Sequence, residues 1–442
     1  MKISRRKFLG ASASAVIVAG MMTKGKVFGA NERIRMCCIG INGQGGSHIK
    51  ALTDKFKDDA DVVALCDVDQ TVLDKRAAEV KAATGKEPKK YRDMREAFAD
   101  PDIDAVTIAT PNHWHALATI WACQAGKDVY VEKPMAHSFW EGKQVIAAAK
   151  KFNRIVQHGT QQRSSERMMR DMKLIHEGFI GDVVHSRGYV YKNGGRHDIG
   201  KGKAGDPPEF LDYDLWQGPA QERPWMWREG GDAKNQPGGL WVHYNWHWFW
   251  DYGNGESGNQ GVHEMDVAVW GMNKGLPTRV YSTGGRYAWA DDGETPNTQV
   301  IDFTYPDGTI LTFEVRNLGS FPEGGKEPCS NSVFGTKGYW VRGEGFYDYK
   351  HKSIEVTAEP PKSRGPFGNF ADAIRSRKWE DIHGNPEEAF DGCAHIHIGN
   401  IAYRLQRALT FDPATSTFPG DEEATKMLKR EYRDPFTVPE IA

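Results

Sequence analysis

Between residues 34 and 156 the sequence alternates short, continuously apolar runs with longer segments of helical periodicity. Apolar runs occupy residues 35–39, 61–66, 105–109 and 128–131, and helical patterns occupy residues 70–84 and 114–125. Strands that are apolar throughout are typical of a parallel sheet, because its crossover helices cover both faces. The sequence therefore predicts an α/β unit in which ligands bind at the carboxyl ends of the strands.

A different pattern begins near residue 183, where the expected strands are longer and often alternate between apolar and polar side chains. These strands are expected at residues 183–191, 278–284, 299–305 and 309–316, and further helices at residues 367–378 and 393–409. Pro306, Asp307 and Gly308 form a hairpin turn between the last two strands. We therefore expect a second, α+β domain with a largely antiparallel, open sheet.

The chain length of 442 residues suits two or three domains. The patterns divide it into residues 1–30, 31–158 and 159–442, and the C-terminal segment is left open to pack back on the first domain. Residues 192–240 are rich in glycine, proline and charge, which predicts a long excursion over one domain face.

The first thirty residues are typical of a targeting segment. They hold six basic and no acidic residues, and a Ser-Arg-Arg-Lys-Phe-Leu stretch at residues 4–9 precedes a weakly apolar run. Paired arginines before such a run indicate a signal peptide for the twin-arginine export machinery, with an uncleaved amphipathic anchor as the alternative. We expect a periplasmic or otherwise extracytoplasmic protein. No later stretch approaches 18 apolar residues, so we expect no membrane span in the mature form.

Net charge and cysteine spacing exclude several classes of partner. Without the first thirty residues, 51 Lys and Arg stand against 59 Asp and Glu, a net charge of −8. A mildly acidic body lacks the basic patch that nucleic acids and anionic lipids require. The six cysteines include no CxxC pair, so we expect small buried side chains and no metal site.

A glycine-rich turn follows the first predicted strand and opens a helix that should run to about residue 57. The residues of this turn are Gly40, Asn42, Gly43, Gln44 and Gly45. Compared with the G-x-G-x-x-G pattern, the first and last glycines fit, and asparagine takes the middle position. The first glycine permits a tight turn, the last permits close helix packing, and the helix N-terminus receives a pyrophosphate.

An acidic residue, Asp67, ends the second predicted strand. A carboxylate at this place accepts hydrogen bonds from the adenosine ribose hydroxyls and repels a 2′-phosphate. Its separation from Gly40 is 27 residues, longer than usual, which a longer helix and loop can absorb. Together with the turn, Asp67 predicts a Rossmann dinucleotide-binding domain over residues 31–158, with NAD preferred and NADP less favoured.

Polar stretches also follow the third and fourth predicted strands. The first contains Thr110, Pro111, Asn112 and His115, and the second is Glu132-Lys133-Pro134. Because the carboxyl ends of parallel strands share one edge of the sheet, both stretches should meet the glycine turn there.

With the glycine turn, Asp67, the Thr-Pro-Asn-x-x-His stretch and Glu-Lys-Pro in this order, the chain resembles the glucose–fructose oxidoreductase/inositol dehydrogenase family, in particular exported members. The resemblance extends to Gly181-Asp182-Val183 and Gly338 and covers nearly all of the mature chain. It implies that Lys133 sits between nicotinamide and substrate and eases proton loss from the reacting hydroxyl. An ammonium next to a developing alkoxide stabilises its charge. An exported enzyme meets little free cofactor, so we expect tightly bound NAD.

The same family carries a helix in its second domain whose His, with an Asp four residues earlier, performs acid–base work. His263 matches this His, but Asn259 stands where the Asp would be. An amide cannot take up a proton. On a continuous helix Asn259, His263 and Asp266 share one face, so Asp266 is expected to orient the imidazole and raise its basicity.

Seven of the 14 tryptophans fall between residues 216 and 250. Flat aromatic faces stack on sugar rings, so Trp246 and Trp248 are candidates for a saccharide site. A core or a subunit interface is the equally favoured alternative. Arg163 belongs to a polar run that matches the family, and it binds substrate or forms a structural ion pair. His395 and His397 are weaker candidates, for which a core or interface role is favoured.

Three functions remain open. The leading one is an exported NAD-dependent oxidoreductase that transfers a hydride between nicotinamide and a ring carbon of a sugar or cyclic polyol. The second is a redox-neutral enzyme that cleaves glycosides through transient ring oxidation, although relatives of this kind depart from Glu-Lys-Pro. The third is a non-catalytic carbohydrate-binding protein. By resemblance, we also expect a homo-oligomer.

Overall fold

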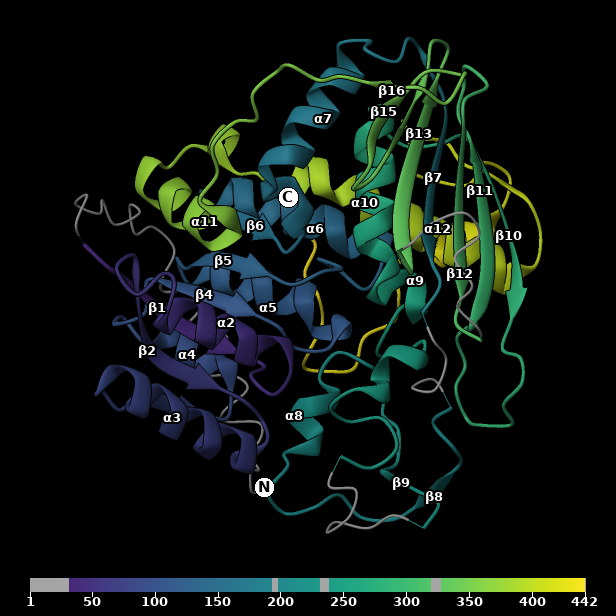
Figure 1. The fold of residues 1–442 in the computed structure, drawn as a ribbon. Coiled ribbons are helices and arrows are strands. Elements are labelled where there is room, and N and C mark those ends of the chain that lie inside the picture. Colours follow the sequence, from purple (N-terminus) through teal and green to yellow (C-terminus); the bar gives the residue numbers. More distant parts are fainter. Residues whose placement is uncertain (1–31, 193–197, 231–237, 319–326, 442) are drawn as a thin grey trace.

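The computed structural model describes residues 32–192, 198–230, 238–318 and 327–441, so the predicted signal peptide lies outside the described residues. Two β-sheets organise this part of the chain (Figure 1). The first has six parallel strands in the order β3-β2-β1-β4-β5-β6. These strands are β1 (Ile34–Ile39), β2 (Ala60–Cys66), β3 (Lys89–Tyr91), β4 (Ala105–Ile108), β5 (Asp128–Val131) and β6 (Val156–His158).

Five helices connect the strands of this sheet. They are α2 (Gln44–Thr53), α3 (Gln70–Thr84), α4 (Met94–Ala99), α5 (Asn112–Gln124) and α6 (Phe139–Lys151). Local sequence sets several of their ends. Asp69 caps α3 by accepting hydrogen bonds from the backbone of Thr71 and Val72, and Gly85 ends it in a left-handed conformation. The strand order reverses between β1 and β4, which leaves a crevice for a ligand at their carboxyl ends.

The second sheet has nine strands in the order β16-β15-β14-β13-β7-β12-β11-β10-β17. Only the β7–β12 pair within it is parallel. Its strands are β7 (Val183–Val190), β10 (Arg279–Gly285), β11 (Thr298–Thr304), β12 (Ile310–Arg316), β13 (Cys329–Gly335), β14 (Tyr339–Val341), β15 (Gly345–Tyr347), β16 (Ser353–Ile354) and β17 (Leu409–Thr410). The predicted fold class, a Rossmann sheet followed by a largely antiparallel open sheet, is confirmed.

The remaining elements lie around and between the sheets. They are η1 (Gln161–Ser164), α7 (Glu166–His176), β8 (Gly202–Ala204), α8 (Tyr213–Gln217), β9 (Met226–Arg228), η3 (Asn245–Trp248), α9 (Gly255–Asn259), α10 (Gly261–Met272), α11 (Gly365–Ser376), η4 (Trp379–Asp381), α12 (Pro386–Leu405) and α13 (Glu422–Lys426). Helices α10 and α12 cover one face of the second sheet, and among the described residues Figure 1 shows no helix over its other face.

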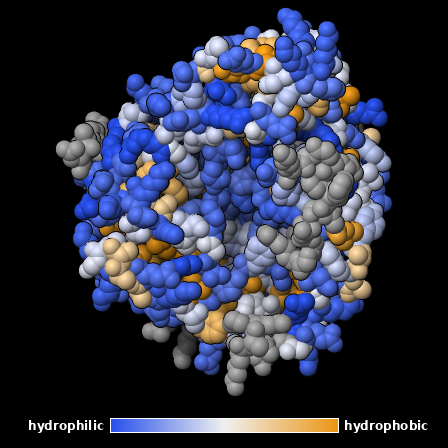
Figure 2. Space-filling model, in the orientation of Figure 1, coloured by the Kyte–Doolittle hydropathy of each residue, from blue (hydrophilic) through white to orange (hydrophobic). Residues whose placement is uncertain are grey.

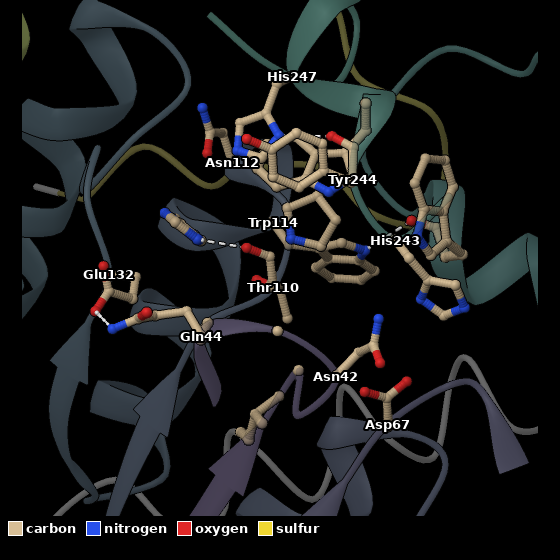
Figure 3. Close-up of a pocket in the computed structure, with 18 of the residues that line it drawn as sticks. Asn42, Gln44, Asp67, Thr110, Asn112, Trp114, Glu132, His243, Tyr244 and His247 are labelled. Carbon is tan, nitrogen blue, oxygen red and sulfur yellow. Dashed lines mark hydrogen bonds between the residues drawn. The ribbon is translucent and has the colours of Figure 1, made fainter. Parts of the chain in front are cut away.

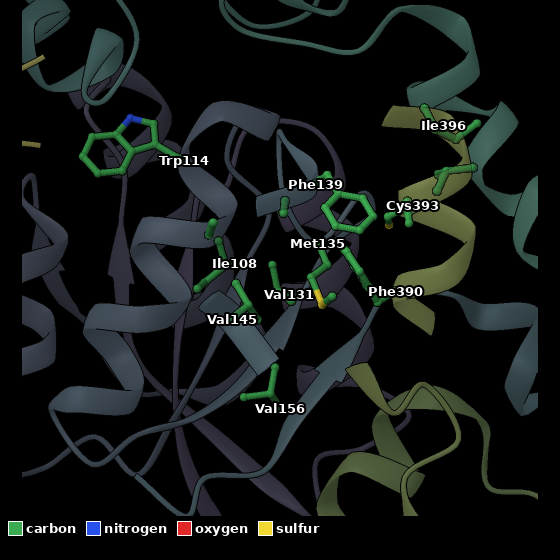
Figure 4. Close-up of a cluster of buried hydrophobic side chains, with 14 of the residues drawn as sticks. Ile108, Trp114, Val131, Met135, Phe139, Val145, Val156, Phe390, Cys393 and Ile396 are labelled. Carbon is green, nitrogen blue, oxygen red and sulfur yellow. The ribbon is translucent and has the colours of Figure 1, made fainter. Parts of the chain in front are cut away.

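The hydrophobic core is continuous from the first sheet to α12 (Figure 4). Val131, Met135 and Phe139 pack in one cluster with Phe390 and Cys393 of α12. Each buried side chain of this size contributes about 1.5–3 kcal/mol relative to its exposed state. Helix α11 packs against the other cluster of the first domain, where Phe367 stacks on Tyr130 of β5. The C-terminal segment therefore fixes the two sheets relative to each other.

Five of the six cysteines are buried, as expected for small apolar side chains, and Cys329 is half-buried. Within the ranges that the structure describes, no helix is both long and apolar enough to cross a membrane.

Candidate active site

A pocket of about 590 Å³ opens at the carboxyl ends of β1, β4 and β5. Figure 2 shows this side of the molecule hollowed between its two halves, with mostly hydrophilic residues around the hollow. Most of the predicted site residues line this pocket. They are Gly40, Asn42, Gly43, Gln44, Asp67, Thr110, Pro111, Asn112, His115, Glu132, Lys133, Trp246, Asn259 and His263. Gly45, Arg163, Trp248 and Asp266 do not line it.

The glycine turn has a backbone that side chains would obstruct. Gly40 has a φ of +73°, and a Cβ there would lie 2.6 Å from the backbone nitrogen of Thr110. A Cβ on Gly45 would lie 2.1 Å from the carbonyl oxygen of Gly40. Both glycines are therefore required for the turn and for close packing of α2 on β1.

The start of α2 fits a phosphate-bearing ligand. Its N-cap residue is Gly43, which has no side chain to satisfy the first-turn N–H groups. A Cβ on Gly43 would meet no atom within 4 Å, so space remains directly beside the backbone. Helix N-termini with open N–H groups bind pyrophosphate. The turn therefore suits the dinucleotide that the sequence predicts.

Asp67 lies near Asn42 at one end of the pocket (Figure 3). Its two carboxylate oxygens accept hydrogen bonds from the backbone N–H groups of Ile41, at 2.8 Å, and Asp69, at 3.0 Å. Burial raises the pKa of Asp67, and these hydrogen bonds only partly oppose that shift. A carboxylate accepts about four hydrogen bonds, so capacity remains for ribose hydroxyls.

Glu132 and Gln44 lie at the other end of the view in Figure 3. Glu132 accepts hydrogen bonds from His48 at 3.0 Å, and from Gln44 and Gln161 at 3.4 Å each. Burial alone would raise its pKa, but His48 and the nearby Lys133 ammonium lower the pKa to about 2. Glu132 is therefore a fixed negative charge.

Lys133 projects from the end of β5 into the pocket. Its Nζ donates a hydrogen bond of 3.0 Å to the backbone oxygen of Asn259, on the opposite wall. Burial lowers the pKa of Lys133, although Glu132 opposes the shift. A buried lysine with a lowered pKa can exchange a proton nearer to neutral pH than an exposed one.

His263 belongs to α10 and lines the same pocket as Lys133. The predicted continuous helix is interrupted at Gln260, so Asn259 ends α9 and His263 lies in α10. The His263 backbone N–H bonds to the Gln260 oxygen at 3.0 Å. The Asn259 carbonyl is thereby left for Lys133. Burial and the Lys133 charge lower the pKa of His263 to about 3, so its imidazole is neutral at ordinary pH.

The structure corrects the expected role of Asp266 and favours the ion-pair alternative for Arg163. Both oxygens of Asp266 accept hydrogen bonds from Arg163 Nε, at 2.9 and 3.0 Å, and the two side chains are 1% and 4% exposed. Arg163 also contacts Glu388. Asp266 is therefore paired with Arg163 rather than with His263, and neither Arg163 nor Asp266 lines the pocket. A buried carboxylate needs a cation close by, and tertiary packing supplies it from η1.

The tryptophan-rich segment forms mainly a core of its own. Trp248 is 1% exposed and packs with Trp225, Trp241 and Phe249, so its predicted contact with a saccharide is corrected. Trp246 is 8% exposed and lines the pocket, with its ring stacked on His247. Of the two alternatives, Trp248 follows the core interpretation, and Trp246 remains beside the site.

The residues after β4 tie the pocket floor together. The ring nitrogens of His115 lie 2.6 Å from the Pro134 carbonyl oxygen and 2.7 Å from that of Thr110. This histidine therefore joins the ends of β4 and β5. The Asn112 amide donates to the side-chain oxygen of Asn254 at 3.1 Å, which joins α5 to the start of α9.

Several pocket residues were not predicted as site residues. They are Lys192, His243, Tyr244, His247 and Gln260. His48 was not predicted either; it does not line the pocket, but its ring contacts Glu132. Lys192 follows the end of β7 much as Lys133 follows β5, and His48 stands one helical turn after Gln44. These positions could have identified Lys192 and His48 as candidates from the sequence. Residues 243–247 showed no comparable sequence pattern apart from their aromatic neighbours. Among the described residues no cluster of His, Cys, Asp and Glu could hold a metal ion.

The chain matches known proteins over most of its length. Residues 34–160 match the model of an oxidoreductase family with an NAD-binding Rossmann fold, and residues 173–438 match that family's C-terminal alpha/beta domain. A glycosyl hydrolase family 109 protein of Shewanella pealeana is 28% identical over 218 residues, 43% of this chain and 47% of the relative. An alpha-N-acetylgalactosaminidase of Shewanella oneidensis is 26% identical over 219 residues, 43% of this chain and 46% of the relative. The match thus spans about half the length of these relatives.

Solved structures share the fold at lower identity. The WlbA dehydrogenase of Bordetella pertussis, solved with NADH and UDP-GlcNAcA, has a TM-score of 0.63 at 20% identity, covering 86% of this chain and 98% of its own. An apo scyllo-inositol dehydrogenase of Lactobacillus casei has a TM-score of 0.58 at 17% identity, covering 86% and 98%. The family that the sequence resembles is confirmed. Because the two family models together cover both sheets and the pocket between them, the chain belongs to the Gfo/Idh/MocA family of NAD-binding oxidoreductases.

Proposed function

We propose that the chain oxidises a ring hydroxyl of a sugar or cyclic polyol, or reduces the corresponding ketone, with NAD as its redox cofactor. One observation carries the proposal. Lys133 and His263 reach one pocket from opposite walls, and the same pocket contains the glycine turn and Asp67. Dinucleotide-binding residues and two proton-handling side chains therefore open on one cavity.

The chain's own residues handle the proton and the charge. NAD, when bound, supplies the ring that takes up or gives back a hydride. Lys133, anchored on the Asn259 carbonyl, is placed to bind the hydroxyl oxygen and to stabilise the negative charge that develops on it. His263 lines the same pocket as a neutral imidazole, so its ring can accept a hydrogen bond from the reacting hydroxyl.

The replacement Lys133→Met tests the proposal. We expect a folded, cofactor-binding protein whose turnover falls on the order of 10²–10⁴-fold, because proton handling and charge stabilisation are lost. Lys143→Met is the control, since Lys143 is exposed and bonds only Ser416 among the described residues. Turnover in the Lys133 variant equal to that in the control would refute the proposal.

A second candidate is redox-neutral cleavage of a glycoside, which the similarity to glycosyl hydrolase family 109 proteins favours. Oxidation of a ring hydroxyl makes the neighbouring C–H acidic, so a glycosidic substituent can leave by elimination. Water then adds, and reduction restores the hydroxyl. The electrons removed at the start return at the end. The intact Glu132-Lys133-Pro134 sequence favours the first candidate.

The two candidates differ in their need for an electron acceptor. The protein is incubated with a chromogenic N-acetylgalactosaminide and, separately, with free sugars and cyclitols. Repeated release of the chromophore without reduced nicotinamide accumulating would establish the cleaving enzyme. One equivalent of reduced nicotinamide, followed by a stop until an acceptor is added, would establish the dehydrogenase.

We further propose export by the twin-arginine pathway and retention of NAD after export. Support for export is the sequence of residues 1–30. Support for retention is a strap, residues 208–212, that crosses the loop after β2. The Gln70 N–H bonds to the Phe210 oxygen at 2.9 Å, and the Asp212 N–H bonds to the Val68 oxygen at 3.0 Å. His243 Nε2 lies 3.1 Å from an Asp69 carboxylate oxygen.

Retention is measured as NAD recovered after gel filtration of purified protein. His243 lies outside the strap, and its side chain contacts Asp69. His243→Ala removes this contact, so we expect several-fold faster loss of NAD. His351→Ala, at an exposed position, is the matched control. Equal retention of NAD in the two variants would show that His243 has no part in retention. Export is measured by cell fractionation, and protein found only in the cytoplasmic fraction would contradict the export proposal.

A homo-oligomer also remains our proposal. The uncovered face of the second sheet carries a row of stacked rings, in which His185 packs on Phe334 and Tyr339 packs on Phe334 and Tyr347. Such a row is suited to a subunit interface. Light scattering of the purified protein measures the oligomeric state, and Phe334→Asp should reduce it to a monomer.

A further inference from the structure

Two ammonium groups meet at neighbouring residues in the wall of the pocket. Lys133 Nζ donates to the backbone oxygen of Asn259 at 3.0 Å, and Lys192 Nζ donates to the side-chain oxygen of Gln260 at 2.7 Å. Lys133 comes from the end of β5 and Lys192 from the end of β7. All four residues line the pocket beside His263. Tertiary structure thus brings two positive charges to the place where substrate would bind.

Neither ammonium is neutralised by a direct ion pair with a described carboxylate, since both acceptors are neutral oxygens. The nearest acids, Glu132, Glu256 and Glu264, raise the pKa of Lys133 through their charge alone, and each has another hydrogen-bond partner. Glu132 accepts from His48, Glu264 accepts from Arg342 at 3.3 Å, and the Glu256 carboxylate accepts from the Asn259 amide at 3.3 Å. Two cations that share a pocket without a paired acid favour an anionic ligand.

Lys192 is also held in place rather than left to move. The Gln260 amide nitrogen donates to both oxygens of Glu264, at 3.2 and 3.3 Å. The amide oxygen is therefore turned away from Glu264 and accepts from Lys192. Glu264 is in turn fixed by Arg342. A lysine whose position is set before binding loses less conformational entropy when it binds a ligand.

We propose that Lys192 binds an oxyanion carried by the substrate, so that the substrate is an acidic sugar or cyclitol rather than a neutral one. The inference rests on the proposed function, in which Lys133 binds the reacting hydroxyl. Lys192 would then bind a carboxylate or a phosphate elsewhere on the same molecule. The lysine ammonium is a compact charge that binds either anion.

The test measures binding to the NAD-loaded full chain by isothermal titration calorimetry. The probes are pairs of uronates or aldonates and their neutral parent sugars, together with the matching sugar phosphates. We expect acids to bind more tightly than their parents. Lys192→Met should weaken acid binding about ten- to hundredfold, which is the value of a charged hydrogen bond, and weaken the binding of neutral sugars much less. Lys192→Arg should restore most of the affinity, and Lys143→Met is the control.

The test also shows whether Lys192 prefers a carboxylate or a phosphate. The preferred anion is the one whose sugar derivatives lose more affinity in the Lys192→Met protein. The inference is overturned if no acid binds better than its parent sugar, or if Lys192→Met leaves acid binding unchanged. Acid binding through Lys192 without turnover would sustain this inference and defeat the proposed function. Oxidation of neutral sugars that does not depend on Lys192 would sustain the proposed function and overturn this inference.

Discussion

At the scale of single residues, burial sets the protonation states in the pocket. Glu132 and His263 both have low pKa values, about 2 and about 3, but for different reasons. For His263 desolvation disfavours the charged form, whereas for Glu132 hydrogen bonds to the charged form overcome desolvation. Near neutral pH the site therefore holds a fixed carboxylate on Glu132 and a neutral imidazole on His263.

Asp67 gives a prediction at this scale. Replacing it with alanine removes a ribose acceptor and the repulsion of a 2′-phosphate, so we expect NAD binding about ten- to hundredfold weaker and a smaller preference over NADP. Titration of both nucleotides into cofactor-free protein measures this.

The structure adds a control, because Asp67 also accepts hydrogen bonds from the Ile41 and Asp69 backbone. Asp67→Asn keeps one acceptor oxygen and removes the charge. It should improve relative NADP binding while weakening NAD less than alanine does. Unchanged affinity for both nucleotides in both variants would show that Asp67 is not the ribose ligand.

At the scale of elements, the interruption between α9 and α10 creates the site. It leaves the Asn259 carbonyl for Lys133 and places the Gln260 side chain between Glu264 and Lys192. Farther along α10, Asp266 ties the helix to Arg163 of η1. The first turn of α10 therefore contributes His263 to the pocket, whereas Asp266 holds the helix in the protein core.

The Arg163–Asp266 pair gives the element-scale prediction. Arg163→Met leaves a buried carboxylate without its cation, so the free energy of unfolding should fall by about 3–5 kcal/mol. Arg163→Met combined with Asp266→Met should recover most of that loss. Urea unfolding measures all three proteins.

Kinetics distinguishes the structural role of Asp266 from the orienting role that the sequence predicted. If Asp266 oriented His263, the double variant would shift the pH profile of kcat. We expect its profile to match that of the parent protein.

At the scale of the whole molecule, the core encloses several histidines as neutral rings. Burial lowers the pKa of His113, His158 and His397 to about 3 in each case, against about 6.5 in the unfolded chain. The unfolded state therefore binds more protons below pH 6.5, and stability is lost as the pH falls from 6.5 toward 3. Each such histidine costs about 1.4 kcal/mol per pH unit across that window.

We therefore expect the free energy of unfolding to fall steeply between pH 6.5 and pH 5 and to change little between pH 7 and pH 8. Urea unfolding across this range measures it. His397→Gln should reduce the slope by about one proton, whereas His351→Gln, at an exposed position, should not. An equal slope in both variants would contradict the assignment.

The sequence by itself determined the local features of this protein. Apolar strands, the Gly40–Gly45 turn, Asp67 and Lys133 follow from backbone sterics, strand burial and the shared edge of a parallel sheet. Helix α3 has the predicted bounds, whereas α2 ends at Thr53 rather than near residue 57. The short strands β14–β17 escaped prediction because two or three residues carry little periodicity, and the seven-residue β13 was also not predicted.

Only the tertiary structure decided which polar groups meet. A helical face predicted that Asp266 would serve His263, but a buried carboxylate pairs with the nearest cation, and the chain fold supplied Arg163 from a distant segment. Trp248 became core while Trp246 stayed beside the pocket. Lys192 and Lys133, far apart in sequence, converge on adjacent residues. Such pairings depend on long-range packing, in which burial forces polar groups to find partners that sequence spacing does not reveal.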